Sequence, residues 1–195
     1  IQRVPLENGA EKTTWRPIEA GLRCENWLRA LGLFGNNLST SLVETVESSL
    51  RQHGRWLVES HAPFQKLSNW GVLQDHGLLL LGLALDEVDW RKTAAARLAE
   101  QLHHQVLADG VHWEQSPLYH CEVLHCCLDS LQTANRVGYS LPPAFVEKTK
   151  ATSLALGQMI RPDGLFFCQS DSDPVDARDL LALAAGLFGD PGLKG

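Results

Sequence analysis

The chain has 195 residues, of which 44% are hydrophobic and 21% are charged. A chain of this length and composition can bury a sizeable core, which excludes intrinsic disorder and favours one folded domain. Its formal net charge of −6 argues against a nucleic-acid-binding protein, and the longest apolar run, Gly77–Leu85, is too short to span a bilayer.

Hydrophobic periodicity predicts seven helices and no strand of useful length, so the expected fold class is all-α. Residues 1–14 are polar, contain glycine and proline, and are expected to form a lead-in to a helical domain over residues 15–195. The expected helices cover residues 15–33, 40–60, 71–85, 89–108, 117–136, 145–160 and 176–188, with Ser39 or Thr40 capping the second and Asp89 the fourth. The short apolar stretch 165–167 is expected to form a strand or a plug.

Short loops make successive helices antiparallel neighbours, so alternate connectors gather at the same end of a helical array. The connectors before the third, fifth and seventh predicted helices are the richest in functional groups. They cover residues 68–70, 112–116 and 169–173. The topology therefore predicts that these three connectors form one polar rim.

The connector before the fifth helix holds the densest set of functional groups. An indole, a carboxylate and an amide at residues 113–115 precede Ser116–Pro117, a helix start that places Tyr119 and His120 in the first turn. Connectors that carry such groups on a rigid scaffold are frequent sites of binding and chemistry. The alternative is that Trp113 and Tyr119 only fill the core and that His120 is solvated.

Two polar residues, Asp75 and His76, interrupt the otherwise apolar third helix, whose composition predicts a buried element. Asn69 lies seven residues before His76, and thus on the same face if the helix extends back that far. Burying Asp75 and His76 is costly unless they are paired. They therefore either satisfy each other locally or line a wet cleft.

The five cysteines have neither a disulfide nor a zinc-ribbon spacing. Cys121 and His125 could share a metal on one helix face, but buried cysteines more often act as small hydrophobic residues. Asp171 and Asp173 could bind a cation, although such residues are typical of turns and helix caps. We expect no metal and no cofactor in this segment.

Four stretches resemble the N-terminal helical domain of the heparinase II/III and alginate lyase group of polysaccharide lyases. They are WRPIE with Arg23 and Asn26–Trp27, SNWG through DHG at residues 68–77, QVLADGVHWEQSPLYH at residues 105–120, and SDSD at residues 170–173. The third stretch is the most specific. The resemblance implies an incomplete (α/α) toroid of antiparallel helical hairpins that cleaves an acidic polysaccharide by β-elimination.

The resemblance also implies roles for particular residues. A lyase removes the C5 proton of a uronic acid, and the resulting carbanion is stabilised through the sugar carboxylate. Tyr119 would be the acid and base, while His76 and Asn69 would neutralise the carboxylate. Asp75 stands where the family generally has an asparagine, so Asn69 is expected to supply the amide and Asp75 to orient His76. The residues expected to contact the substrate are Asp75, Trp70, Trp113, Glu114, Gln115, His120, Arg16 and Arg23.

Alternatives remain open for several of these residues. Arg16 and Arg23 suit a carboxylate or sulfate, but structural pairing with Glu19 is as reasonable. Glu114 and Asp75 could instead form the acid and base of a glycoside hydrolase. A second alternative function is a non-catalytic carbohydrate-binding or scaffold domain, and a third is a plain helical-repeat interaction protein.

The expected partners are an acidic polysaccharide, either heparan-sulfate-like or alginate-like, and a C-terminal β-sandwich domain of the same polypeptide. Family enzymes carry a further catalytic histidine on that domain, so this chain is expected to be a piece of a longer enzyme. No nucleic-acid or membrane partner is expected. The resemblance favours a periplasmic or secreted location. The sequence itself adds no support, because it shows no signal-peptide pattern.

Overall fold

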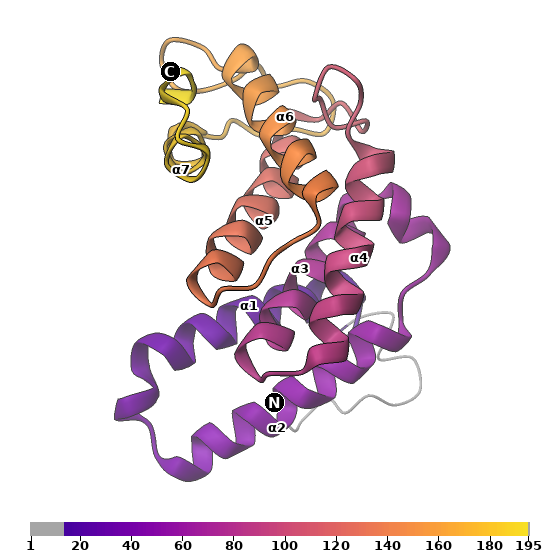
Figure 1. Ribbon diagram of the computed structural model, residues 1–195, viewed down its shortest axis with the longest axis vertical. Helices are drawn as coiled ribbons and strands as arrows, with labels where there is room; N and C mark the ends of the chain where they lie inside the picture. Colours follow the sequence, from indigo (N-terminus) through magenta and orange to yellow (C-terminus); the bar gives the residue numbers. More distant parts are fainter. Residues whose placement is uncertain (1–13, 195) are drawn as a thin grey trace.

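The computed structural model describes residues 14–194 (Figure 1) and is helical throughout, without a strand in that range. The seven predicted helices are confirmed. They are α1 (Pro17–Phe34), α2 (Thr40–Glu59), α3 (Asn69–Ala84), α4 (Val88–Gln105), α5 (Pro117–Arg136), α6 (Pro143–Met159) and α7 (Arg178–Phe188). Three short 3-10 turns complete the described chain: η2 (Gly35–Asn37), η3 (Pro63–Leu67) and η4 (Pro191–Lys194). The predicted lead-in, residues 1–14, lies outside the described residues except for Thr14.

Two helix starts differ from the prediction because other residues cap them. Helix α3 begins at Asn69, two residues early, because the Ser68 hydroxyl accepts a hydrogen bond from the Trp70 N–H at 3.3 Å. Helix α4 begins at Val88, so Asp89 lies in its first turn and is not the cap. The early start of α3 brings its N-terminal turn, with Asn69, to the end of the array.

The apolar stretch before α7 forms no regular strand. Phe166 makes an isolated bridge with Ile160, and Leu165 makes one with Asp176. The Asp176 carboxylate accepts the Arg178 N–H at 3.0 Å, which explains why α7 begins at Arg178 and not at Asp176. Phe166 is buried in the core between α5 and α7, so the stretch is a plug.

Helix α3 is the central element of the array, as its apolar composition predicted. Every residue from Gly71 to Gly82 is buried, and the helix packs against α1, α2, α4 and α5 (Figure 1). The contact with α1 depends on two glycines: a Cβ on Gly21 would lie 2.5 Å from the Leu73 carbonyl oxygen, and one on Gly77 would lie 2.5 Å from the Gly21 carbonyl oxygen. Glycine at both positions therefore lets the two backbones touch.

The core is divided into two clusters that share α5. The larger joins α1 to α5 around Leu50, Leu78 and Leu98, and the smaller joins α5, α6 and α7 around Leu156 and Leu181. Helix α5 thus carries side chains into both clusters, which holds the start of α5 in a fixed place relative to α3.

All five cysteines are free thiols. Cys24, Cys121, Cys126 and Cys127 are buried, as expected for small hydrophobic residues, and Cys168 is exposed. Among the described helices, none has the length and apolar character needed to cross a membrane.

Candidate functional site

The predicted polar rim is confirmed by hydrogen bonds that join the three connectors. The Asn69 N–H donates to Glu114 Oε1 at 3.0 Å, and the Asn69 side-chain amide donates to Glu114 Oε2 at 3.3 Å. The Ser116 hydroxyl donates to the Asp171 carbonyl oxygen at 2.7 Å. We call the residues 68–70, 113–119 and 171–172 the rim; the connectors from α4 to α5 and from α6 to α7 lie in the upper part of Figure 1.

Tyr119 lies in the first turn of α5, where Ser116 caps the helix and accepts the Tyr119 N–H at 3.3 Å. The phenol is partly exposed and donates a short hydrogen bond to the Asp171 carboxylate. This hydrogen bond to an ionised acceptor raises the pKa of Tyr119 to about 12. The phenol therefore holds its proton firmly at neutral pH, while its hydroxyl stays at the surface of the rim.

Other predicted residues of the rim also have accessible surface. Trp70 has the Arg16 guanidinium carbon over its ring, 5.3 Å from the centroid, and Arg16 also pairs with Glu19. Trp113 is 44% exposed, and the exposed Gln115 has a φ of +55°. The rim thus offers two indole faces and one guanidinium beside Asn69 and Tyr119.

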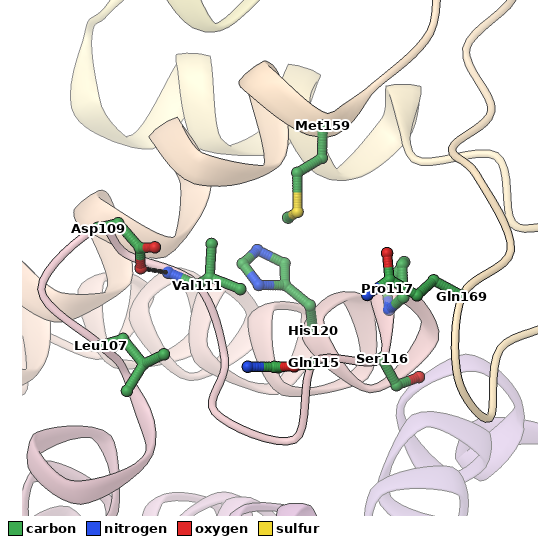
Figure 2. Close-up of a pocket in the computed structure, with 9 residues that line it drawn as sticks. All are labelled: Leu107, Asp109, Val111, Gln115, Ser116, Pro117, His120, Met159 and Gln169. Atoms are coloured by element: carbon green, nitrogen blue, oxygen red, sulfur yellow. Dashed lines mark hydrogen bonds between the residues drawn. The ribbon is translucent and has the colours of Figure 1, made fainter.

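A cleft of about 260 Å³ lies beneath the connector that leads into α5 (Figure 2). The His120 ring occupies its centre, below Met159. Its Nδ1 accepts the His112 N–H at 3.3 Å and its Nε2 donates to the Thr152 carbonyl oxygen at 3.0 Å. Burial lowers the pKa of His120 to about 4, so the ring is neutral.

The structure does not support His120 as a solvated or substrate-binding residue. It is 1% exposed and both ring nitrogens are occupied by backbone partners, so it holds the connector against α6.

Two buried residues that position the rim were not predicted. The His112 Nε2 donates to Gln105 Oε1 at 2.9 Å, and the Gln105 amide donates to the Ser68 and Lys66 carbonyl oxygens at 3.0 Å each. This chain of hydrogen bonds connects the end of α4 to the turn that precedes α3. A single glutamine in a helix and a single histidine in a loop give no sequence signal of such a pairing.

Asp75 is bound to residues of α4 and not to the rim. Its carboxylate is fully buried and accepts from the Gln101 amide at 2.6 Å and from Arg97 at 3.4 Å. Burial raises the pKa of Asp75 to about 7. The predictions that Asp75 orients His76, contacts substrate, or pairs with Glu114 in a hydrolase are therefore wrong in geometry, because its oxygens face α4.

His76 is also buried away from the rim. It is 1% exposed, its Nδ1 lies 3.0 Å from the Ser130 hydroxyl, and its Nε2 faces Glu25 and Asp129. Seven residues of helix place it about 10 Å further along α3 than Asn69. The structure therefore does not bring His76 together with Tyr119 and Asn69.

Arg23 lies in the packing between α1 and α2. Its Nε donates to His53 Nε2 at 3.1 Å, and its guanidinium carbon is 5.5 Å from the Trp15 ring centroid. Desolvation lowers the pKa of Arg23. Of the two predicted arginines, only Arg16 lies beside the rim.

These features define an incomplete (α/α) toroid of antiparallel helical hairpins with one polar rim that carries a tyrosine, an amide and two indoles. The chain belongs to the family described as Heparinase II/III N-terminus, whose family model matches residues 1–188.

Two curated relatives are both named heparin-sulfate lyase. The one from Pedobacter heparinus is 26% identical over 166 residues, covering 81% of this chain and 25% of the relative. The one from Bacteroides thetaiotaomicron is 26% identical over 152 residues, covering 71% of this chain and 21% of the relative. The chain thus spans about a quarter of the length of these relatives.

Among solved structures, the crystal structure of heparinase III matches with a TM-score of 0.85 at 19% identity, covering 97% of this chain and 31% of that one. The heparan sulfate lyase HepC from Pedobacter heparinus matches with a TM-score of 0.73 at 24% identity, covering 96% and 31%. At these identities the two structures confirm the fold.

Proposed function

We propose that this chain is the helical part of a lyase that cleaves a uronic-acid-containing glycosaminoglycan of the heparan sulfate class by β-elimination. The observation that carries the proposal is the rim, where the Tyr119 hydroxyl and the Asn69 amide are held on neighbouring connectors. The curated relatives, both named heparin-sulfate lyase, favour heparan sulfate over alginate as the substrate class. A C-terminal β-sandwich domain of the same polypeptide is part of the proposal and would close the site from the other side.

In the proposed mechanism, Tyr119 exchanges protons with the substrate. Its hydrogen bond to Asp171 favours the protonated phenol, which suits a general acid that protonates the leaving glycosidic oxygen. For the preceding step, the phenolate form of Tyr119 takes the C5 proton, and the phenol so formed gives that proton to the leaving glycosidic oxygen, so that no proton is left on the protein. Asp171 orients the phenol through its hydrogen bond and is a positioning residue.

Asn69 is the rim residue best suited to the sugar carboxylate, because an amide donates without carrying a charge that needs a counter-ion. Glu114 accepts both its backbone and side-chain N–H groups, which fixes the orientation of the amide. Trp70 and Trp113 supply apolar faces for sugar rings, and Arg16 supplies the positive charge nearest to them. The proposed lyase site does not include Asp75, His76, Arg23 or His120.

The test is an ultraviolet assay for the unsaturated uronate that β-elimination leaves on the new non-reducing end. The full-length gene product is incubated with heparan sulfate, heparin and alginate beside its Tyr119→Phe variant. Tyr139→Phe is the matched control, since Tyr139 packs on the core away from the rim. We expect absorbance with the glycosaminoglycans and a loss of at least about 100-fold in rate for Tyr119→Phe alone.

Two outcomes would overturn the proposal in different ways. A full-length protein that produces no absorbance with any of the polymers contradicts the lyase reaction. A Tyr119→Phe variant as active as Tyr139→Phe leaves the lyase intact and removes Tyr119 from the mechanism.

A further inference from the structure

A cluster of metal-ligand type lies beneath the rim, where three helices cross. Glu25 on α1, His76 on α3 and Asp129 on α5 each offer one ligand atom, and these atoms lie within 4.8 Å of one another. The glycine contact between α1 and α3 makes this possible, because Gly21 is one turn before Glu25 and Gly77 follows His76. None of the three side chains serves the proposed lyase chemistry.

His76 points into the cluster with a nitrogen that has no hydrogen bond. The ring is 1% exposed, and its Nδ1 lies 3.0 Å from the Ser130 hydroxyl. Its Nε2 is buried and makes no hydrogen bond, and it lies at ion-pair distance from two carboxylates. Buried polar atoms are nearly always hydrogen-bonded, and a divalent ion between this nitrogen and the two anionic oxygens would bond all three atoms directly.

The separations fit a tetrahedral ion. Nε2 of His76 lies 3.3 Å from Asp129 Oδ2 and 3.6 Å from Glu25 Oε2. Two atoms bound to one tetrahedral metal at about 2.1 Å lie about 3.4 Å apart. Only small shifts of the three side chains are therefore needed to close the shell around an ion.

Arg29 is bound on the other side of the two carboxylates and does not block this position. It reaches Glu25 Oε1 at 3.0 Å and Asp129 Oδ1 at 3.1 Å, while Oε2 and Oδ2 are the oxygens nearest to His76. Its guanidinium balances part of the carboxylate charge and orients both groups, as partners of metal-bound carboxylates commonly do.

A second imidazole binds the outer oxygen of Glu25. His125 lies one turn before Asp129 on α5, is half exposed, and has its Nε2 3.5 Å from Glu25 Oε1, the oxygen that also binds Arg29. Donation from His76 Nδ1 to the Ser130 hydroxyl would leave the Nε2 lone pair free for a metal. A cleft of about 300 Å³ bordered by Glu25, Arg29 and Asp129 gives an ion access from solvent.

We propose that Glu25, His76 and Asp129 form a structural site for a divalent first-row transition metal such as zinc. One or two imidazoles beside two carboxylates suit zinc, cobalt or manganese better than magnesium or calcium, which prefer all-oxygen shells. The ion links α1, α3 and α5 below the rim. The site departs from the sequence-based expectation of no metal in this segment.

The first test is calorimetric titration of the EDTA-treated, tag-free 195-residue chain with ZnCl₂, with MgCl₂ as the comparison ion. We expect one zinc per chain and no magnesium binding at the same concentrations. At a free zinc concentration of 100 times Kd, thermal unfolding should move upward by about 5 °C or more.

Near-isosteric variants assign the site. Glu25→Gln and Asp129→Asn should each weaken zinc binding at least about tenfold, and His125→Gln should weaken it less because His125 contacts only the outer oxygen of Glu25. The matched control is the double variant His103→Gln and His104→Gln, which removes a solvent-exposed histidine pair on α4. Zinc binding lost in the control and kept in Glu25→Gln and Asp129→Asn would overturn the proposal.

A measurement on the unmodified chain covers the case in which the variants fail to fold. X-ray absorption of the one-to-one zinc complex should show a first shell of nitrogen and oxygen only. A shell that contains sulfur would place the ion on the cysteines, and the absence of zinc binding would contradict the site directly; either result overturns the proposal.

Discussion

The two ends of the polar stretch in α3 use the same chemical groups for different purposes. At the rim, Asn69 is joined to the Glu114 connector, and the Tyr119 hydroxyl remains at the surface. Two turns further along, Asp75 and His76 are buried and bind side chains of α1, α4 and α5. We call Asp75, His76 and the side chains that they bind the buried belt. An amide and a carboxylate therefore join connectors at the rim, and in the buried belt the same two kinds of group join helices.

The difference follows from what surrounds each group. The rim residues Asn69 and Tyr119 are bound to the carboxylates of Glu114 and Asp171, which water can reach, so removing one partner leaves a carboxylate that stays solvated. Belt residues are charged groups out of contact with water, and the loss of one partner leaves the other buried and alone. We therefore expect belt substitutions to change stability and rim substitutions to change activity.

The largest expected effect on stability comes from removing His76. His76→Ala leaves Glu25 and Asp129 facing each other, with Arg29 bound to both and His125 bound to Glu25, and creates a cavity in addition. We expect a loss of about 3–5 kcal/mol in the free energy of unfolding, measured by urea denaturation in the presence of EDTA. His103→Ala, at an exposed position on α4, is the control and should stay within about 0.5 kcal/mol. Breaking a buried ion pair typically costs about 3 kcal/mol or more. A loss below about 1 kcal/mol for His76→Ala would therefore show that the buried contacts of His76 do not stabilise the fold.

Asp75 predicts a pH dependence of stability. Burial raises its pKa from 3.8 to about 7, so the folded state binds the proton more tightly than the unfolded state. The stability that proton binding at Asp75 adds to the folded state is thus present in full below about pH 4 and is lost as the pH rises through about 7. Relative to Asp75→Asn, the unmodified chain should lose up to about 4 kcal/mol between pH 4 and pH 8.

Comparing the two proteins at each pH isolates Asp75, since other titrating groups are common to both. The reverse slope, with Asp75→Asn losing relative stability as the pH rises, would mean that Arg97 and Gln101 outweigh desolvation at this carboxylate.

The same contrast explains how far the sequence could predict this molecule. The seven helices and the rim follow from periodicity, caps and short connectors, because these depend on local chemistry and on antiparallel topology. The face on which Asp75 lies could not be obtained in the same way, because its partners, Gln101 and Arg97, are on another helix. His120 was misplaced for a similar reason, since only the folded chain brings Thr152 to its ring.

A substitution at Asp171 tests whether this carboxylate controls the pKa of Tyr119 without contributing to the free energy of unfolding. Replacing its carboxylate in Asp171→Asn should lower the pKa of Tyr119 from about 12 toward its ordinary value of 10.0. An ultraviolet titration of phenolate, in a Tyr139→Phe background, measures this shift directly. Asp173→Asn is the matched control and should leave the titration unchanged, while both variants should unfold within about 0.5 kcal/mol of their parent. An unchanged Tyr119 titration in Asp171→Asn would show that the phenol is not controlled by this carboxylate.

The smallest expected effect is the difference in stability between the loss of a helix cap outside the rim and the loss of one within it. Ser39 is exposed, and its hydroxyl accepts the Leu42 N–H at 3.3 Å and lies 3.3 Å from the exposed Ser41 hydroxyl. Ser116 is buried, accepts the Tyr119 N–H at 3.3 Å and also donates to the Asp171 carbonyl oxygen at 2.7 Å. We expect Ser39→Ala to cost about 0.5–1 kcal/mol, and Ser116→Ala to cost about 1–2 kcal/mol because it also unpairs a carbonyl oxygen. Urea denaturation of the two variants gives this difference, and equal losses would mean that the bond to Asp171 adds nothing to the stability of the rim. In that case the loop before α7 would be held by its other contacts, and Asp171 would affect only the titration of Tyr119.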